Sequence, residues 1–378
     1  MRRCLLITIL IAWFWVPSLL YARLRVPPGG EDVRDLAQHA PLVFRGKVLQ
    51  LSLTKDQPEN KEGIAVIGVD RWYRGSVRLR YSSRVRIRFT YSAVGSFEGH
   101  NCVDLVLASH WIFFAQAHDP AVLELFHDCE GALAVSALLA LQPSDDFLSQ
   151  IEADFRAGLS DSEPEARLAS IQRLAGLSLS SSRKALREVI SHGTETESKW
   201  ALLGVLKTGD GSAVSLAAPV LLSLRHEEFE PYPQPEGAMA LALENLRDRV
   251  AVPKLIEILN GAPDELVRSC ASHALMEIKD PRALDAFADH LSDQSQYVRY
   301  NSLIGMEYIT HTPACTIAKP EEAERAEPLC KIWWDSRRKD LKSELTQFCA
   351  RNSSPRVSVD CLAATPNMPP TYPRPSRC

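Results

Sequence analysis

Two successive segments in the C-terminal half of the chain repeat each other, and this repeat constrains the fold more than any other feature of the sequence. The segments run from Asp248 to Lys279 and from Asp280 to Thr310, and they align at a period of about 31 residues. Each segment holds two runs with apolar residues at i, i+3, i+4 and i+7, which is the spacing of one face of an α-helix. Because a single helix pair buries that face only against a neighbouring pair, the repeat predicts a helical solenoid.

Looser copies precede these two units. The stretch from Glu165 to Leu177 matches a second helix, and helix pairs follow over residues 182–206 and 211–247. We therefore expect repeats over residues 161–310. The expected core of the best-matched unit consists of apolar and small residues: Leu255, Ile256, Leu259, Val267, Cys270, Ala271, Ala274, Leu275 and Ile278.

The repeats resemble HEAT repeats, in the short variety that is also found in phycobilin-lyase-type proteins. An arginine recurs at one position of the second helix, as Arg167, Arg268 and Arg299. The resemblance implies a ladder in which each arginine ties adjacent repeats together through an acidic partner; the alternative is a contact with a ligand. It also leaves open a lyase-like enzyme that attaches chromophores, although such lyases act in the cytosol.

The N-terminal half is predicted to be all β. Apolar runs alternate with polar ones over residues 42–53, 63–76, 83–91, 102–117 and 121–129, and polar loops separate them. Short strands at this spacing favour a small barrel or sandwich. Residues 130–141 have helical potential and are expected to close the unit. The predicted fold is therefore multidomain, with an all-β barrel followed by an all-α solenoid.

Residues 32–141 resemble the OB-fold barrel of netrin C-terminal modules and tissue inhibitors of metalloproteinases. The resemblance is carried by "APLVFRGKVLQL" as the first strand, by "VDRWYRG" at the end of the second, and by a cysteine before "WIFFAQA". In that family such a cysteine commonly pairs with one in the place of Cys129. The inhibitors chelate the protease zinc through an N-terminal Cys-x-Cys, whereas the mature start expected near Arg23 has no cysteine. Protease inhibition by that mechanism is therefore not expected.

Residues 1–22 have the order of a secretory signal peptide: a short positive run, an apolar run and a small residue for cleavage. The alternative is an uncleaved anchor, because the apolar run is slightly long for a signal. We expect an exported protein, either periplasmic or secreted.

Cysteine usage is consistent with export. Removing Cys4 from the nine cysteines leaves eight, and an even set outside the cytosol favours disulfides. Proximity suggests three pairs: Cys102–Cys129, Cys315–Cys330 and Cys349–Cys361. The competing interpretation of the first pair is a zinc site formed with His100 and His127, because two His-x-Cys pairs bracket this segment. Cys270 lies within a helical pattern and is expected to be a buried thiol.

Arginines gather in the segment from Arg71 to Arg88. Strand alternation places Arg84, Arg86 and Arg88 on one face, opposite Val85, Ile87 and Phe89. The pattern is repeated by Arg78 and Arg80. Such a strip is either an ordinary solvated exterior or a face that binds an anionic glycan, a lipid headgroup or an acidic protein. Nucleic acid is not expected as a partner of an exported chain.

The rest of the chain points away from catalysis. Residues 318–351 are predicted to form one or two capping helices, with Trp333 and Trp334 sealing the last repeat. The proline-rich tail over residues 353–378 is predicted to be disordered. "HEEFE" at residues 226–230 lacks the second histidine of a zinc protease helix, and no phosphate-binding or nucleophile motif appears.

We therefore expect a non-enzymatic binding or scaffold protein that needs no cofactor and no metal. Solenoids use extended surfaces for protein partners. The expected partner site consists of the exposed positions of the second helices, with the barrel as a second contact or an envelope attachment. These helices are expected to begin near Glu165, Glu197, Glu236, Asp264 and Gln296.

Overall fold

The computed structural model describes residues 32–57, 60–75, 82–92, 105, 107–119, 121–126, 131–140, 146–225, 235–317 and 322–352. The chain divides into two compact units, Met1–Leu133 and Ala134–Cys378. No helix among these described residues is long and apolar enough to cross a bilayer. The predicted signal segment and the proline-rich tail lie outside the described residues.

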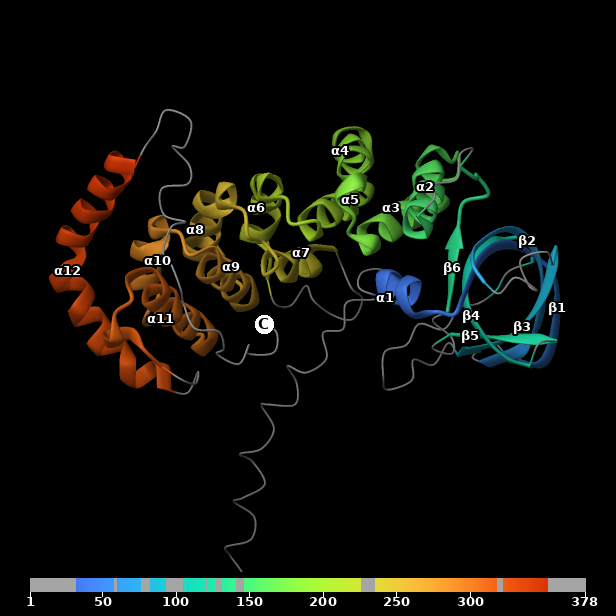
Figure 1. The fold of residues 1–378 in the computed structure, drawn as a ribbon, viewed down its shortest axis with the longest axis horizontal. Coiled ribbons are helices and arrows are strands. Elements are labelled where there is room, and N and C mark those ends of the chain that lie inside the picture. The colour runs from blue at the N-terminus through green and yellow to red at the C-terminus, as the bar shows by residue number, and fades with distance from the viewer. Residues whose placement is uncertain are drawn as a thin grey trace, which may run out of the picture. The chain divides into compact units, whose positions relative to one another are not determined.

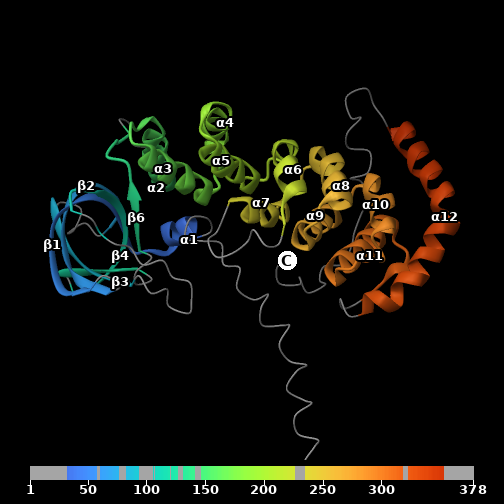
Figure 2. The same ribbon diagram turned by 180° about the vertical axis from the view of Figure 1, so that it is seen from behind.

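The first unit is a closed five-stranded barrel preceded by the helix α1 (Asp32–His39). Its strands are β1 (Leu42–Gln57), β2 (Asn60–Arg74), β3 (Arg84–Ser92), β4 (His110–Asp119) and β5 (Val122–Leu125). They are ordered β1-β2-β3-β5-β4, and β1 also pairs with β4, which closes the ring (Figure 2). The β3–β5 pair is parallel and the other pairs of the ring are antiparallel. This confirms the predicted OB-like barrel.

Alternation along the strands builds the barrel core. Val85, Ile87 and Phe89 of β3 are buried, whereas the arginines between them are exposed, as the alternation predicts. Phe44 of β1 packs against Phe113 of β4, with ring centroids 5.2 Å apart.

The helix expected within residues 130–141 is not there. Ala132–Val135 instead form the strand β6, which lies next to β4 in the sheet. Alanine and leucine favour helices, but their propensities amount to only tenths of a kcal/mol per residue. Pairing with β4 outweighs that preference, and Ala132 and Leu133 are buried.

The second unit is a stack of helices that continues the chain from α2. The first helices of the successive pairs are α2 (Phe147–Ala157), α4 (Arg183–His192), α6 (Val214–Ser223), α8 (Val252–Gly261) and α10 (Leu284–Asp289). The second helices are α3 (Pro164–Leu177), α5 (Glu195–Lys207), α7 (Pro235–Leu243), α9 (Glu265–Ile278) and α11 (Gln296–Thr310). The chain ends its described part in α12 (Ala323–Asn352).

Each second helix packs on the next one, from α3 through α5, α7 and α9 to α11. Figure 1 shows this row along one side of the stack, with α4, α6, α8 and α10 along the other. The expected core of the α8–α9 unit is buried except at one position. Ile256 is half-buried, and Ile258 takes the core place instead, because α8 turns its 252, 255, 258 and 259 positions inward.

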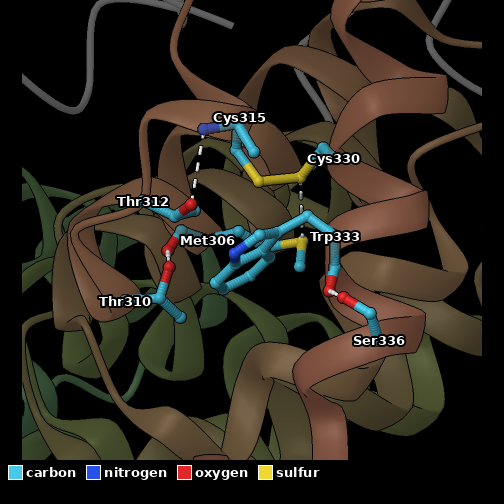
Figure 3. The surroundings of a disulfide bond; sticks show 8 residues. Met306, Thr310, Thr312, Cys315, Cys330, Trp333 and Ser336 are labelled. Carbon is cyan, nitrogen blue, oxygen red and sulfur yellow. Dashed lines mark hydrogen bonds between the residues drawn. A yellow bond between two sulfur atoms is a disulfide. The ribbon is translucent and has the colours of Figure 1, made fainter.

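The end of the stack is covered by α12. A disulfide joins Cys315 to Cys330, one of the three pairs suggested by proximity, and both cysteines are buried (Figure 3). Trp334 is 1% exposed, and Trp333 lies beside it with ring centroids 6.4 Å apart. The tryptophan pair and the disulfide therefore hold the capping helix on the last repeat. The suggested partner of Cys349 lies outside the described residues.

Candidate protein-binding surface

The recurring arginines of the second helices occupy one structural position. Each guanidinium donates through Nη1 to two consecutive carbonyl oxygens of the loop that precedes its own helix. The acceptors are Asp161 and Ser162 for Arg167, Ala262 and Pro263 for Arg268, and Asp293 and Gln294 for Arg299, at 2.6–3.2 Å. The arginine therefore fixes the turn between the two helices of its repeat.

Two of these arginines also reach the next repeat. Arg167 donates to Glu197 at 3.2 Å, and Arg268 makes two hydrogen bonds to Asp293, at 3.1 and 3.0 Å. These are the acidic ties that the resemblance implies. Arg299 has no carboxylate partner among the described residues. The chain after α11 passes into α12 rather than into another helix pair, so the ladder ends there.

Asp293 is the centre of the best-connected junction. Its Oδ2 lies 3.0 Å from Nδ1 of His290, and the Nε2 of that histidine lies 3.1 Å from Oδ1 of Asn260. Burial by itself raises the pKa of Asp293, but hydrogen bonds from His290 and Arg268 outweigh it and hold that pKa well below its usual range. The carboxylate is therefore charged and fully engaged, which suits a structural role.

A second recurring device was missed in the sequence. Asp210, Asp248 and Asp280 each accept a hydrogen bond from the N–H two residues later and so begin a short 3₁₀ turn. The turns are η5 (Gly211–Ala213), η7 (Arg249–Ala251) and η8 (Pro281–Ala283), and each leads into a first helix. The signal was the pattern Asp-x-x-Ala, whose alanine is buried each time.

The solvent-facing side of the second helices carries charges that pair across neighbouring helices. Lys199 of α5 lies 2.9 Å from Glu236 of α7, and Arg247, which follows α7, lies 3.1 Å from Glu277 of α9. Tyr297 of α11 is 37% exposed on the same row. The row therefore presents a surface of mixed charge with an exposed tyrosine, a residue type that is enriched at protein interfaces.

The barrel carries the predicted arginine row of β3. Arg84, Arg86 and Arg88 are exposed. Arg88 is paired with Glu124 of β5 at 2.8 Å, whereas no acidic side chain of the described part of the chain pairs with Arg84 or Arg86. Arg78 and Arg80 lie outside the described residues, so the predicted second row is not placed.

A polar group inside the barrel was not anticipated. Arg45 of β1 is 1% exposed and lies 3.8 Å from Asp70 of β2, which is also 3.8 Å from Nε2 of His110 at the start of β4. The His110 side chain is 19% exposed. Burial lowers its pKa, and the nearby Arg45 and Lys47 act in the same direction against Asp70.

The described residues hold no cluster of histidine, cysteine and acidic side chains arranged to bind a metal ion. Cys102 and Cys129 lie outside the described residues, together with their neighbouring histidines. The disulfide and the zinc site therefore both remain predictions from the sequence. The HEEFE segment also lies outside.

Comparison with known protein families supports the predicted HEAT-like repeats in part of the helical unit. Residues 218–307, which run from α6 to α11, match the family model of HEAT repeats. No curated protein matches the chain.

Proposed function

We propose that this protein is an exported, non-enzymatic scaffold that binds a protein partner on the row of second helices α3, α5, α7, α9 and α11. The observation that carries the proposal is the unbroken packing of each second helix on the next. Such a row gives one extended surface, and solenoids use surfaces of this kind for protein partners. The match of residues 218–307 to HEAT repeats supports the same function.

The contacts beneath this surface favour a preformed binding site. The arginine ties at Arg167 and Arg268 fix the spacing between repeats, and the cross-helix pair Lys199–Glu236 fixes side chains on the surface itself. A rigid surface loses little conformational entropy when a partner docks, and more of the contact energy then appears as affinity.

Export is supported by the disulfide between Cys315 and Cys330, since disulfides persist mainly in oxidising compartments. The apolar segment over residues 1–22 supplies the targeting signal in this proposal. The barrel, which resembles netrin and inhibitor modules in sequence, supplies a second contact or an attachment to the envelope.

The proposal is tested by crosslinking the full-length protein in intact cells of its own organism and mapping the crosslinks by mass spectrometry. Tyr297→Asp on the second helix α11 is expected to reduce partner crosslinks, because it replaces an exposed aromatic side chain of the row by a charge. Leu216→Asp is the matched control: Leu216 is 47% exposed, but it lies on the first helix α6.

The scaffold assignment is wrong if Leu216→Asp removes the crosslinks and Tyr297→Asp leaves them. It is equally wrong if every crosslink maps to residues 32–133, because the helical unit would then be only a spacer.

A further inference from the structure

The outer side of β1, β2 and β3 combines exposed arginines with aliphatic side chains that are partly in solvent. Arg84, Arg86 and Arg88 are exposed on β3, and Ile64 and Val66 are half-buried on β2. Leu49 of β1 is 41% exposed. We call these six residues the arginine face.

The strand register places the two kinds side by side. Arg88 lies opposite Ile64, Arg86 opposite Val66, and Arg84 opposite Gly68. A Cβ atom at Gly68 would lie 2.9 Å from Leu49 Cδ1, so the leucine covers the glycine next to Arg84. Each arginine therefore has an aliphatic neighbour at its own level of the sheet.

The structure already contains one example of the group that this row accepts. Glu124 on the neighbouring strand β5 binds Arg88 at 2.8 Å, and its register partner on β3 is Arg88 itself. A carboxylate carried by an extended chain next to β3 thus fits the row. Arg84 and Arg86 have no such carboxylate from the described residues.

The spacing of the row indicates the form of the ligand. Residues i and i+2 of a strand lie about 6.6–6.8 Å apart, and the same distance separates alternate side chains of any extended peptide. β3 pairs with β2 from Arg84 to Ser92 and with β5 at Ile87 and Arg88. We therefore expect a ligand of this face to bind through side chains and not by adding a strand.

We infer that the arginine face binds an extended acidic segment of a partner protein. Carboxylates at alternate positions of the segment pair with Arg84 and Arg86, and its aliphatic side chains cover Val66, Ile64 and Leu49. A purely anionic polymer would pair with the arginines but leave this aliphatic surface in water, which favours a peptide. The inference goes beyond the scaffold function and does not depend on it.

The test measures binding of a fluorescein-labelled peptide of about eight residues with alternating Glu and Val, long enough to span the row at about 3.4 Å per residue. Full-length protein is titrated, and fluorescence anisotropy reports the Kd. Arg84→Gln with Arg86→Gln is expected to weaken binding about tenfold, because two exposed ion pairs with the peptide are lost. Val66→Ser is expected to weaken it a few-fold.

Two further variants sharpen the test. Glu124→Gln removes the internal carboxylate from Arg88 and is expected to tighten binding about threefold, because the guanidinium of Arg88 can then pair with the peptide. Arg337→Gln with Lys339→Gln removes the same charge from exposed positions of α12 and is expected to leave Kd within about twofold.

A peptide of the same composition with its Glu residues in one block is expected to bind more weakly. The inference is overturned if the arginine pair can be removed without loss of peptide binding, with folding verified by circular dichroism. It is also overturned if phosphatidylserine vesicles or heparin bind through Arg84 and Arg86 while the alternating peptide does not.

Discussion

The two units use arginine in opposite ways. In the barrel, Arg84 and Arg86 extend into solvent without an acidic partner among the described residues. In the helical stack, Arg268 is 16% exposed and makes two hydrogen bonds to loop carbonyls and two to Asp293. With four of its five N–H donors engaged, Arg268 has little left for a ligand, whereas an exposed guanidinium keeps more of its donors available. The number of hydrogen-bond acceptors around each guanidinium therefore distinguishes arginines that stabilise the fold from arginines that are available to bind a ligand.

Replacing Arg268 is expected to produce the largest effect. Arg268→Ala leaves Asp293 buried without its guanidinium and frees two loop carbonyls, so the free energy of unfolding should fall by about 2–4 kcal/mol. Urea denaturation followed by helical circular dichroism measures it. Lys254→Ala, which removes an exposed pair with Glu257 on α8, should cost less than about 1 kcal/mol. Equal losses for the two variants would show that Arg268 contributes no more to stability than an exposed ion pair does.

Removing the charge of Asp293 is expected to have the next largest effect. Asp293→Asn should cost about 1–3 kcal/mol at pH 7. Because the pKa of Asp293 is lower in the folded protein than in the unfolded chain, its stabilisation is present above the unfolded value of about 3.9 and is lost as pH falls further towards the folded value. The variant should therefore lose less stability than the wild type when acidified from pH 4. Asp289→Asn, an exposed neighbour, should retain the wild-type acid profile.

Replacing Arg299 measures the contribution of the loop contacts without a tie between repeats. Among the described residues, its guanidinium bonds only to the carbonyls of Asp293 and Gln294, so Arg299→Ala should destabilise by about 1 kcal/mol. A thermal melt beside Arg268→Ala gives the comparison. If Arg299→Ala proves as costly as Arg268→Ala, the acidic partner contributes nothing and the loop contacts account for the whole effect.

The smallest change in the free energy of unfolding is expected from replacing the exposed arginines of β3. Replacing Arg84, Arg86 and Arg88 together by glutamine should shift the free energy of unfolding by less than about 1 kcal/mol, because exposed charges contribute little. The melting temperature should stay nearly unchanged. A collapse of folding would show that the row has a structural function and would remove it from consideration as a binding face.

The sequence predicted positions better than partners. The repeat period placed Arg167, Arg268 and Arg299 at one helical position, and the structure agrees. The repeat period did not predict which acidic residues pair with these arginines, because Glu197 lies in a capping box at the start of α5 whereas Asp293 lies in a loop. Residues that do not share a place in the repeat cannot be found by aligning repeats.

Two local errors have a common cause. Ile256 was expected in the core in place of Ile258, and residues 132–135 were expected to be helical. Both depend on which neighbour a segment packs against: the adjoining helices fix the rotation of α8, and β4 fixes the strand. Local pattern and propensity carry no information about either neighbour. Strand alternation in β3 succeeded because a single buried face determines it.

The aspartates that begin the turns before α6, α8 and α10 have a consequence for engineering. Asp210 and Asp248 are 38 positions apart, whereas Asp248 and Asp280 are 32 apart, yet each begins the same turn, and the turns after Asp210 and Asp248 contact each other. The additional length falls in the sequence between Ser223, where α6 ends, and Pro235, where α7 begins. Units of unequal length therefore begin with the same turn. The chain between Ser223 and Pro235 is thus a natural place to insert a reporter sequence or an affinity tag without changing the stacking of helices on either side.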